Sequence, residues 1–255
     1  MSVFGKFPRT FWVANVIELF ERWAWYGFFM LFANYLTGSS DAGGLEFTQE
    51  QKGWLMGVGT GILYFLPVLT GAIADRYGYR KVLFLAFLIY VSAFLLLPQF
   101  STFTGVFLMY LYLAVGAALF KPVISATIAK TTTDATASIG FGIFYMMVNI
   151  GAFTGKTVID PLRNVIGEQA YIYINYFSAT MTILALLSVV LLYKSTHTAG
   201  EGKSMREIGQ GFLRIITNWR LLILILIITG FWMVQQQLYA TMPKYVIRMA
   251  GETAK

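Results

Sequence analysis

Apolar stretches of about 20 residues repeat along this 255-residue chain and constrain its fold more than any other feature. A helix of that length spans roughly 30 Å, the thickness of the hydrocarbon core of a bilayer. The predicted spans are residues 11–36, 52–75, 82–99, 103–129, 137–160, 172–193 and 219–243. Charged residues make up only 12% of the chain, about half the share usual in soluble domains. The sequence therefore predicts an all-α, multi-pass membrane protein.

The distribution of Lys and Arg predicts the orientation of these spans. With a cytoplasmic N-terminus, eleven basic residues lie on the cytoplasmic side and six on the opposite side. The six are Lys52, Lys156, Arg163, Lys244, Arg248 and Lys255. The apolar run after Phe11 is too long for a cleavable leader, so we expect it to remain as the first span.

Composition excludes several other classes of protein. The chain has no cysteine and a single histidine, so we expect no disulfide, no metal site and no cofactor other than a coupling proton. The net charge of +7 follows mostly from orientation, and we expect no nucleic-acid partner. No span or loop assembles a nucleophile, a base and an oxyanion donor, so we do not expect an enzyme.

Residues 195–218 form the one substantial linker. Charged residues alternate there with apolar ones at helical spacing, which fits either a cytoplasmic helix on the membrane surface or a plain tether. We expect three parts: a six-helix bundle over 1–194, the linker over 195–218, and a seventh helix over 219–255 that begins an incomplete second bundle.

Four ionisable residues inside the predicted spans point to function. Glu18, Glu21 and Arg22 occupy the first span at spacings of three and four residues, so they share one helical face, and Lys121 occupies the fourth. Each unpaired charge at mid-membrane costs about 2.5–3.5 kcal/mol. We expect these side chains to pair or to line water, either as a structural ion pair or as an exchangeable, proton-linked cluster.

Other positions in the spans give weaker signals. Gly53, Gly57 and Gly61 are spaced for close helix contact. Pro67 and Pro122 are expected to break helical hydrogen bonding, as in transporter helices around a central cavity. Asn149 fits either a helix–helix contact or a ligand contact.

Four motifs together resemble the proton-dependent oligopeptide transporter family, a branch of the major facilitator superfamily. The first is Glu-x-x-Glu-Arg in the first span, which ends at Tyr26-Gly27. The second is the loop between the second and third spans, from Gly71 to Lys81. The third is Phe120-Lys-Pro-Val-Ile-Ser125, and the fourth runs from Phe144-Tyr to Asn149-Ile-Gly-Ala-Phe153. The motifs occur in the family's order and cover the first six spans.

The resemblance implies roles for the matching positions. The implied substrate-binding residues are Arg22, Trp25, Tyr26, Tyr64, Lys121 and Asn149. The implied proton-coupling residues are Glu18, Glu21, Arg22 and Lys121. The implied conformational loop motif comprises Gly71, Asp75, Arg76, Gly78, Arg80 and Lys81. The resemblance also implies that Arg22 and Lys121 hold the C-terminal carboxylate of a peptide.

The chain departs from the family pattern at two places. Trp25 stands where the family often has a second tyrosine, so a hydroxyl is lost. In the seventh span, Trp232, Gln235 and Gln236 mark the expected site, and Gln236 replaces a proton-linked glutamate found in many members. Because glutamine cannot titrate, coupling through that helix is in question.

The resemblance implies a proton-coupled symporter that imports di- and tripeptides across the inner (plasma) membrane by alternating access, with lipid and a second helical bundle of the same transporter as partners. The same cations suit nitrate or another small anion or zwitterion, which stays open as an alternative. A non-transporting membrane sensor is a further alternative. The peptide side-chain preference, proton stoichiometry and oligomeric state do not follow from the sequence.

Overall fold

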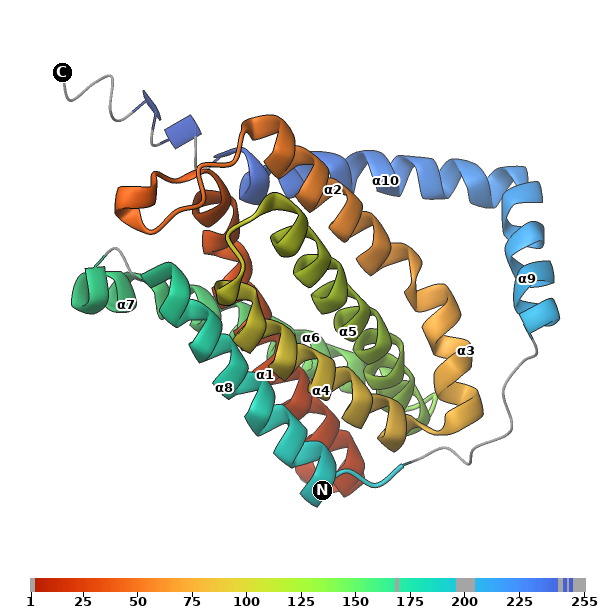
Figure 1. Cartoon of the computed structure of the whole chain (residues 1–255). Coiled ribbons are helices and arrows are strands. Elements are labelled where there is room, and N and C mark those ends of the chain that lie inside the picture. Colours follow the sequence, from red (N-terminus) through yellow and green to blue (C-terminus); the bar gives the residue numbers. More distant parts are fainter. Residues whose placement is uncertain (1–2, 168–169, 196–204, 243–244, 247, 250–255) are drawn as a thin grey trace. The chain divides into compact units, whose positions relative to one another are not determined.

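The computed structural model describes residues 3–167, 170–195, 205–242, 245–246 and 248–249, and every element in those ranges is a helix. The chain divides into two units, Met1–Gly202 and Lys203–Lys255 (Figure 1). Each unit is described by itself.

The first unit contains a helix for each of the first six predicted spans. The long helices are α1 (Arg9–Thr37), α2 (Gln49–Phe65), α3 (Pro67–Tyr77), α4 (Tyr79–Leu96), α5 (Phe103–Lys130), α6 (Ala137–Thr157) and α8 (Ala170–Leu191). Short elements are α7 (Ile159–Ile166) and the 3₁₀ turns Val3–Lys6, Ser40–Ala42 and Leu97–Gln99. The helical nature of the predicted spans is confirmed.

Five described helices are long and apolar enough to cross a membrane, or six if α2 and α3 are counted as one bent span. The α1 helix is not among them although it has 29 residues. The reason is its ionisable residues, because Glu18, Glu21 and Arg22 lower its hydropathy. A helix with this composition needs internal partners for its charges.

Pro67 and Pro122 act differently in the helices that contain them. Pro67 starts α3, and the axis bends by 42° between α2 and α3, so the predicted break there is confirmed. Pro122 lies inside α5, which continues from Phe103 to Lys130. Pro122 has no N–H to donate, so one hydrogen bond of α5 is lost as predicted, but the neighbouring turns keep the helix continuous around it.

Local sequence signals fix where the helices begin. Thr48 and Gln51 form a capping box at the start of α2, and the Thr102 hydroxyl accepts from the Gly105 N–H at the start of α5. Gly78 joins α3 to α4 with a φ of 93°, a conformation that strongly favours glycine.

The α1 helix packs against α6 and α8, while α4 packs against α5 and α8, and α2 and α3 pack against α5. Figure 1 shows α8, α4 and α5 running alongside one another. Aromatic rings fill the contacts: Phe28 meets Phe94 at 5.4 Å between ring centres, and Phe32 meets Tyr110 at 4.8 Å. These buried rings connect α1 to α4 and α5, in addition to its main packing against α6 and α8.

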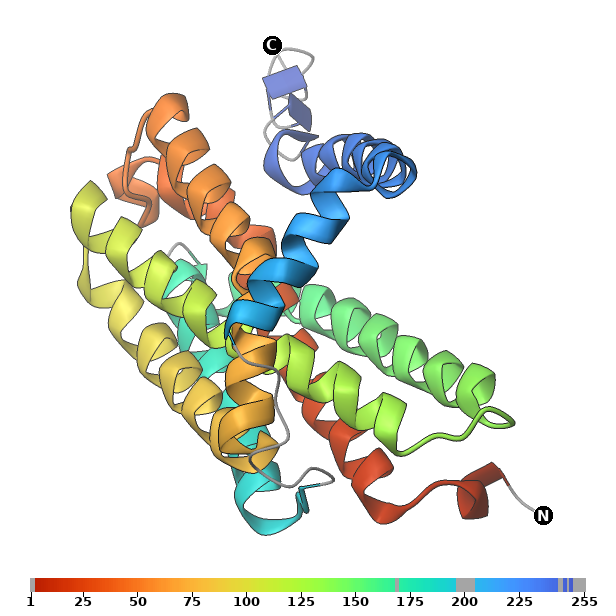
Figure 2. The ribbon, with the colours of Figure 1, turned by 90° about the vertical axis from the view of Figure 1, so that its right-hand side faces the viewer.

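Glycines bring α1 and α6 into backbone contact (Figure 2, α1 in red and α6 in green). A Cβ at Gly155 would lie 2.6 Å from the Trp23 carbonyl oxygen and 3.1 Å from the Gly27 nitrogen. A Cβ at Gly151 would lie 2.8 Å from the Leu19 carbonyl oxygen. No side chain fits between the two helices at these points.

The close contact predicted for Gly53, Gly57 and Gly61 is not found in the described part of the chain. All three are exposed on α2, and a Cβ at any of them would meet nothing within 4 Å. The glycine of α2 that does pack closely is Gly59, where a Cβ would clash with the ring of Tyr110 on α5. A four-residue spacing identifies a helix face but not what that face meets.

The second unit contains α9 (Met205–Thr217) and α10 (Trp219–Ala240). The helix expected as one alternative for the linker is present as α9. The side chain of Asn218 starts α10 by accepting from the Leu221 N–H at 3.2 Å. Apolar residues occupy all sides of α10 over its first half, as in a helix surrounded by lipid or protein.

Candidate functional site

The two carboxylates of α1 are buried in the first unit. Glu18 and Glu21 are completely shielded from solvent, whereas Arg22 keeps 15% of its side chain exposed. Arg22 binds Glu21 with two hydrogen bonds, Nε to Oε2 at 2.5 Å and Nη2 to Oε1 at 2.7 Å. This two-point geometry holds the guanidinium against one carboxylate.

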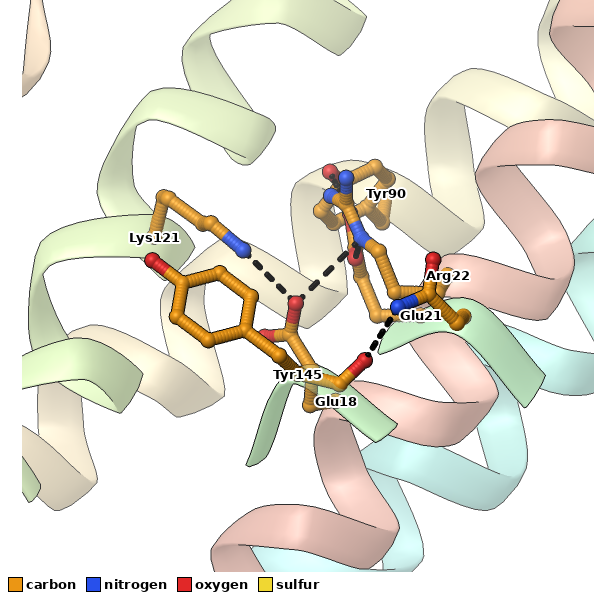
Figure 3. A network of polar contacts seen from close by, with 7 residues as sticks. Glu18, Glu21, Arg22, Tyr90, Lys121 and Tyr145 are labelled. Carbon is orange, nitrogen blue, oxygen red and sulfur yellow. Dashed lines mark hydrogen bonds and ion pairs between the residues drawn. The ribbon is translucent and has the colours of Figure 1, made fainter. Parts of the chain in front are cut away.

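Glu18 is shared between two cations on different helices (Figure 3). Its Oε1 atom lies 2.6 Å from Lys121 Nζ on α5 and 3.4 Å from Arg22 Nε on α1. Its other oxygen, Oε2, is buried without a hydrogen-bond partner among the described residues. The Lys121 side chain is 41% exposed. The expected pairing of all four ionisable residues is confirmed.

Two further aromatic residues complete this cluster: Tyr90, which was missed from the sequence, and Phe144, which opens the fourth motif but was given no role there. Tyr90 of α4 donates its hydroxyl to Glu21 Oε1 at 2.5 Å (Figure 3). Phe144 of α6 lies with its ring centre 5.4 Å from Lys121 Nζ, a cation–π contact. The only sequence signal for Tyr90 is its hydroxyl, a polar group inside an apolar span that needs a hydrogen-bond partner. The signal is weak, because a tyrosine ring is also common in an ordinary apolar core.

The two aromatic residues expected at the site on α1 differ in surroundings. Trp25 is 8% exposed and stacks on Phe29 with ring centres 5.7 Å apart, inside the apolar packing. Tyr26 is half-buried, and the Arg22 guanidinium lies over its ring at 5.8 Å. Of the two, Tyr26 is the one whose ring contacts a charged member of the cluster.

Asn149 and Tyr64 stand on exposed faces. Asn149 donates through Nδ2 to the Tyr145 carbonyl oxygen of its own helix at 2.8 Å, and Figure 3 includes Tyr145. Tyr64 of α2 is 62% exposed, on the same helix as the exposed Gly61.

The predicted loop motif lies at the junction of α3 and α4. Asp75 accepts the Tyr79 hydroxyl at 3.0 Å, and Arg80 donates to the Val190 carbonyl of α8 at 2.6 Å. Arg76 and Lys81 are exposed there, and Gly71 faces Pro122 of α5. The motif therefore ties α3 and α4 to the end of α8.

The residues expected on the seventh span lie in the second unit. Trp232, Gln235 and Gln236 all belong to α10, where Trp232 packs edge-on against Phe231 at 5.7 Å. Gln235 and Gln236 follow Trp232 by three and four residues, about one helical turn, so the three share one side of α10.

The geometry leaves one carboxylate in a position to change partners. Glu21 is held by Arg22 and Tyr90, but Glu18 depends on a lysine from another helix that solvent can reach. An anion at Lys121 would compete directly with Glu18 for the ammonium group.

A family model of the Major Facilitator Superfamily matches residues 12–254. The chain belongs to the Major Facilitator Superfamily. This is a superfamily of membrane transporters rather than enzymes, as the sequence motifs indicate.

Curated relatives are similar at low identity. The uncharacterized transporter YclF of Bacillus subtilis (strain 168) is 23% identical over 201 residues, which cover 78% of this chain and 40% of the relative. Dipeptide and tripeptide permease B of Photorhabdus asymbiotica is 25% identical over 194 residues, 74% of this chain and 38% of the permease. Multidrug resistance protein MdtH of Yersinia enterocolitica is 24% identical over 212 residues, which cover 80% of this chain and 51% of MdtH.

Solved structures of POT family transporters share the fold. A POT family transporter in complex with 5-aminolevulinic acid aligns with a TM-score of 0.69 at 24% identity, over 88% of this chain and 47% of that one. A peptide transporter POT in complex with sulfate aligns with a TM-score of 0.70 at 21% identity, over 89% of this chain and 46% of the transporter. This superfamily member thus spans about half the length of the proteins that it resembles, or less.

Proposed function

We propose that this protein is a proton-coupled symporter that imports di- and tripeptides across the cell membrane by alternating access. The observation that carries the proposal is the position of Glu18 Oε1 between Lys121 at 2.6 Å and Arg22 at 3.4 Å. A buried carboxylate between cations of two helices couples anion binding to its own charge state.

The proposed exchange follows from burial. A peptide carboxylate that binds Lys121 draws the ammonium group away from Glu18, whose surroundings are dry. Glu18 then keeps only the longer contact to Arg22, and a proton on the carboxylate removes the uncompensated charge. Substrate and proton would in this way bind together and leave together.

The names of similar proteins support this choice of substrate. One relative is a dipeptide and tripeptide permease, and one solved neighbour is in complex with a thioalcohol-conjugated peptide. Alternating access in such transporters rocks two bundles around a central site, so the peptide's amino end would be held by a second bundle. We place the N-terminus in the cytoplasm from the Lys and Arg distribution.

A small anion or an amino-acid-like zwitterion is the second candidate substrate. The cations Arg22 and Lys121 suit any carboxylate, and solved neighbours are in complex with sulfate and with 5-aminolevulinic acid. The experiment below separates the two candidates.

The decisive experiment measures uptake of labelled dialanine by the full-length protein in proteoliposomes under an inward proton gradient. We expect uptake that a protonophore abolishes and that Lys121→Ala reduces to background. The matched control is Lys130→Ala, which removes another lysine of α5 that also lies over an aromatic ring, that of Tyr79 at 4.9 Å. The control should keep wild-type uptake.

Other outcomes would change the proposal in defined ways. Uptake that depends on Lys121 but not on the gradient would make the protein a facilitator. No dialanine uptake by correctly folded protein, together with Lys121-dependent uptake of 5-aminolevulinic acid, would favour the zwitterion.

A further inference from the structure

The α9 helix has one apolar and one polar side. At about 100° per residue, five apolar residues of its sequence fall within one narrow arc of the helix: Met205, Ile208, Phe212, Ile215 and Ile216. The opposite side holds Glu207, Gln210 and Arg214. Leu213, at the edge of the apolar side, is 57% exposed. A helix divided in this way needs an apolar partner on one side and water on the other.

The α10 helix determines the level at which α9 lies. Its residues Trp219–Leu238 are long and apolar enough to cross a membrane, and only Asn218 separates α10 from α9. The end of α9 therefore lies where the chain enters the bilayer. Trp219, the first residue of α10, is 69% exposed, and tryptophan is enriched at the interface between membrane and water.

The break at Asn218 turns α9 out of the axis of α10. Asn218 has a φ of −87° and a ψ of 98°, an extended conformation that does not continue a helix. Figures 1 and 2 both show α9 running across the direction of α10 rather than in line with it. Because α10 runs through the bilayer, a helix that crosses its direction at this level runs along the bilayer surface.

The charge of this segment suits an anionic surface. From Lys194 to Arg220 the sequence has five basic and two acidic residues, a surplus of three positive charges with His197 neutral. The basic residues are Lys194, Lys203, Arg206, Arg214 and Arg220, and the acidic residues are Glu201 and Glu207. Each basic residue near a membrane surface adds about 1 kcal/mol of attraction to anionic lipid. In the register of α9, Arg206 falls at the border between the polar and apolar sides, the level of the headgroups.

We propose that α9 lies on the bilayer surface, with its apolar side at the boundary of headgroups and acyl chains, and that the basic residues around it bind anionic lipid headgroups. Lipid, rather than a second bundle or another copy of the chain, then covers the apolar side. The linker becomes a surface anchor instead of a plain tether. This inference does not depend on the transported substrate.

The test places single nitroxide labels on both sides of α9. This chain has no cysteine, so the full-length protein is labelled at one introduced cysteine, in a background without others, and placed in nanodiscs that contain phosphatidylglycerol. Electron paramagnetic resonance measures collisions of the label with oxygen, which concentrates in the bilayer, and with a water-soluble nickel chelate. Labels at Ile208→Cys and Phe212→Cys should favour oxygen. The matched controls Gln210→Cys and Arg214→Cys should favour the chelate.

Two other outcomes would overturn lipid as the occupant. Few collisions with either reagent at Ile208→Cys and Phe212→Cys would show that protein covers this side. A preference for the chelate at all four positions would place α9 in water. Two positions on each side keep the result independent of any single substitution.

The role of charge is tested by changing the lipid. The ratio of bilayer-inserted to water-exposed label at Phe212→Cys should rise when phosphatidylglycerol replaces part of the phosphatidylcholine. Arg206→Gln should lower that ratio about fivefold in the anionic nanodiscs, the effect of about 1 kcal/mol, and Arg206→Lys should retain it. An equal ratio in both lipids, or an unchanged ratio in Arg206→Gln, would overturn the contact with anionic headgroups.

Discussion

Glu21 has both carboxylate oxygens occupied, because Arg22 binds each of them and Tyr90 donates to Oε1. The sequence predicts that these charges pair, since isolated charges in a span are too costly. It does not predict that Tyr90 is a partner of Glu21, because the two residues are 69 positions apart in the chain and lie on different helices. Partners that depend on how helices pack are visible only in the structure.

Tyr90→Phe should destabilise the protein by about 1.5–3 kcal/mol, because it removes a buried hydrogen bond to a charged group. Thermal unfolding of the purified protein would measure the loss. Tyr112→Phe is the matched control, since it removes a more exposed hydroxyl that bonds Ser92 Oγ at 3.0 Å, and it should cost less than about 1 kcal/mol. Equal losses in both variants would contradict the role given to Tyr90.

The loop after α1 contains a carboxylate outside the spans. Glu46 Oε1 accepts from the Ser40 N–H at 2.8 Å and from the Ser40 hydroxyl at 2.7 Å. These two hydrogen bonds lower the pKa of Glu46 below its usual value. The ionised form therefore closes the loop over Ser40–Glu46.

The Glu46 contact should weaken in acid. Because the folded-state pKa is lowered, its stabilisation is present above the ordinary glutamate pKa and is lost as pH falls through the lowered value. Exchange of the Ser40 amide hydrogen, followed by mass spectrometry, should lose protection over that range. In Glu46→Gln the protection should be weaker at neutral pH and nearly independent of pH, and a pH response equal to that of the wild type would exclude Glu46 as its source.

At the scale of helices, the sequence indicates glycine contacts but assigns them to the wrong helix. Gly53, Gly57 and Gly61 have the expected spacing and are exposed, whereas Gly151 and Gly155 have the same spacing and contact the α1 backbone. Spacing defines a face of a helix, and only the packing order of the bundle decides which face is covered. The difference between Pro67 and Pro122 has a local cause instead, since Pro67 occupies the first position of α3, where no intrahelical donor is lost, and Pro122 lies inside α5.

Gly155→Ala should destabilise the bundle by about 1–3 kcal/mol, because the added methyl group would lie 2.6 Å from the Trp23 carbonyl oxygen. Gly142→Ala on the same helix is the matched control, since its Cβ meets nothing within 4 Å, and it should be neutral or stabilising by up to about 1 kcal/mol. Thermal unfolding of both variants tests the contact. A stable Gly155→Ala protein would show that α1 and α6 do not meet there.

At the scale of the whole molecule, hydropathy and charge predict the helices and their order. The long helices of the first unit correspond to six apolar runs, of which α2 and α3 together make up one, and the four charges in the spans do meet. The approach of Lys156 to Tyr26 is not predictable, because it depends on two glycines that allow backbone contact. Such contacts depend on small residues, and the hydropathy of a span does not show which of its glycines meet another helix.

The orientation in the membrane can be tested directly, because the chain has no native cysteine. In intact cells, a membrane-impermeant maleimide should label Asp41→Cys, which follows one span from a cytoplasmic N-terminus. It should label Lys81→Cys only after the membrane is permeabilised, since that residue lies beyond the second span. Both residues are exposed, and the reverse pattern would invert the predicted orientation.

The backbone contact between α1 and α6 has one more consequence. With no side chains between them, the two helices cannot slide past each other without breaking the contact at Gly27 and Gly155. The backbones of α1 and α6 are therefore kept at a fixed spacing near Arg22 and Lys156. Any rearrangement that moves α1 has to carry α6 with it, so a change in the spacing of helices within this unit has to occur elsewhere.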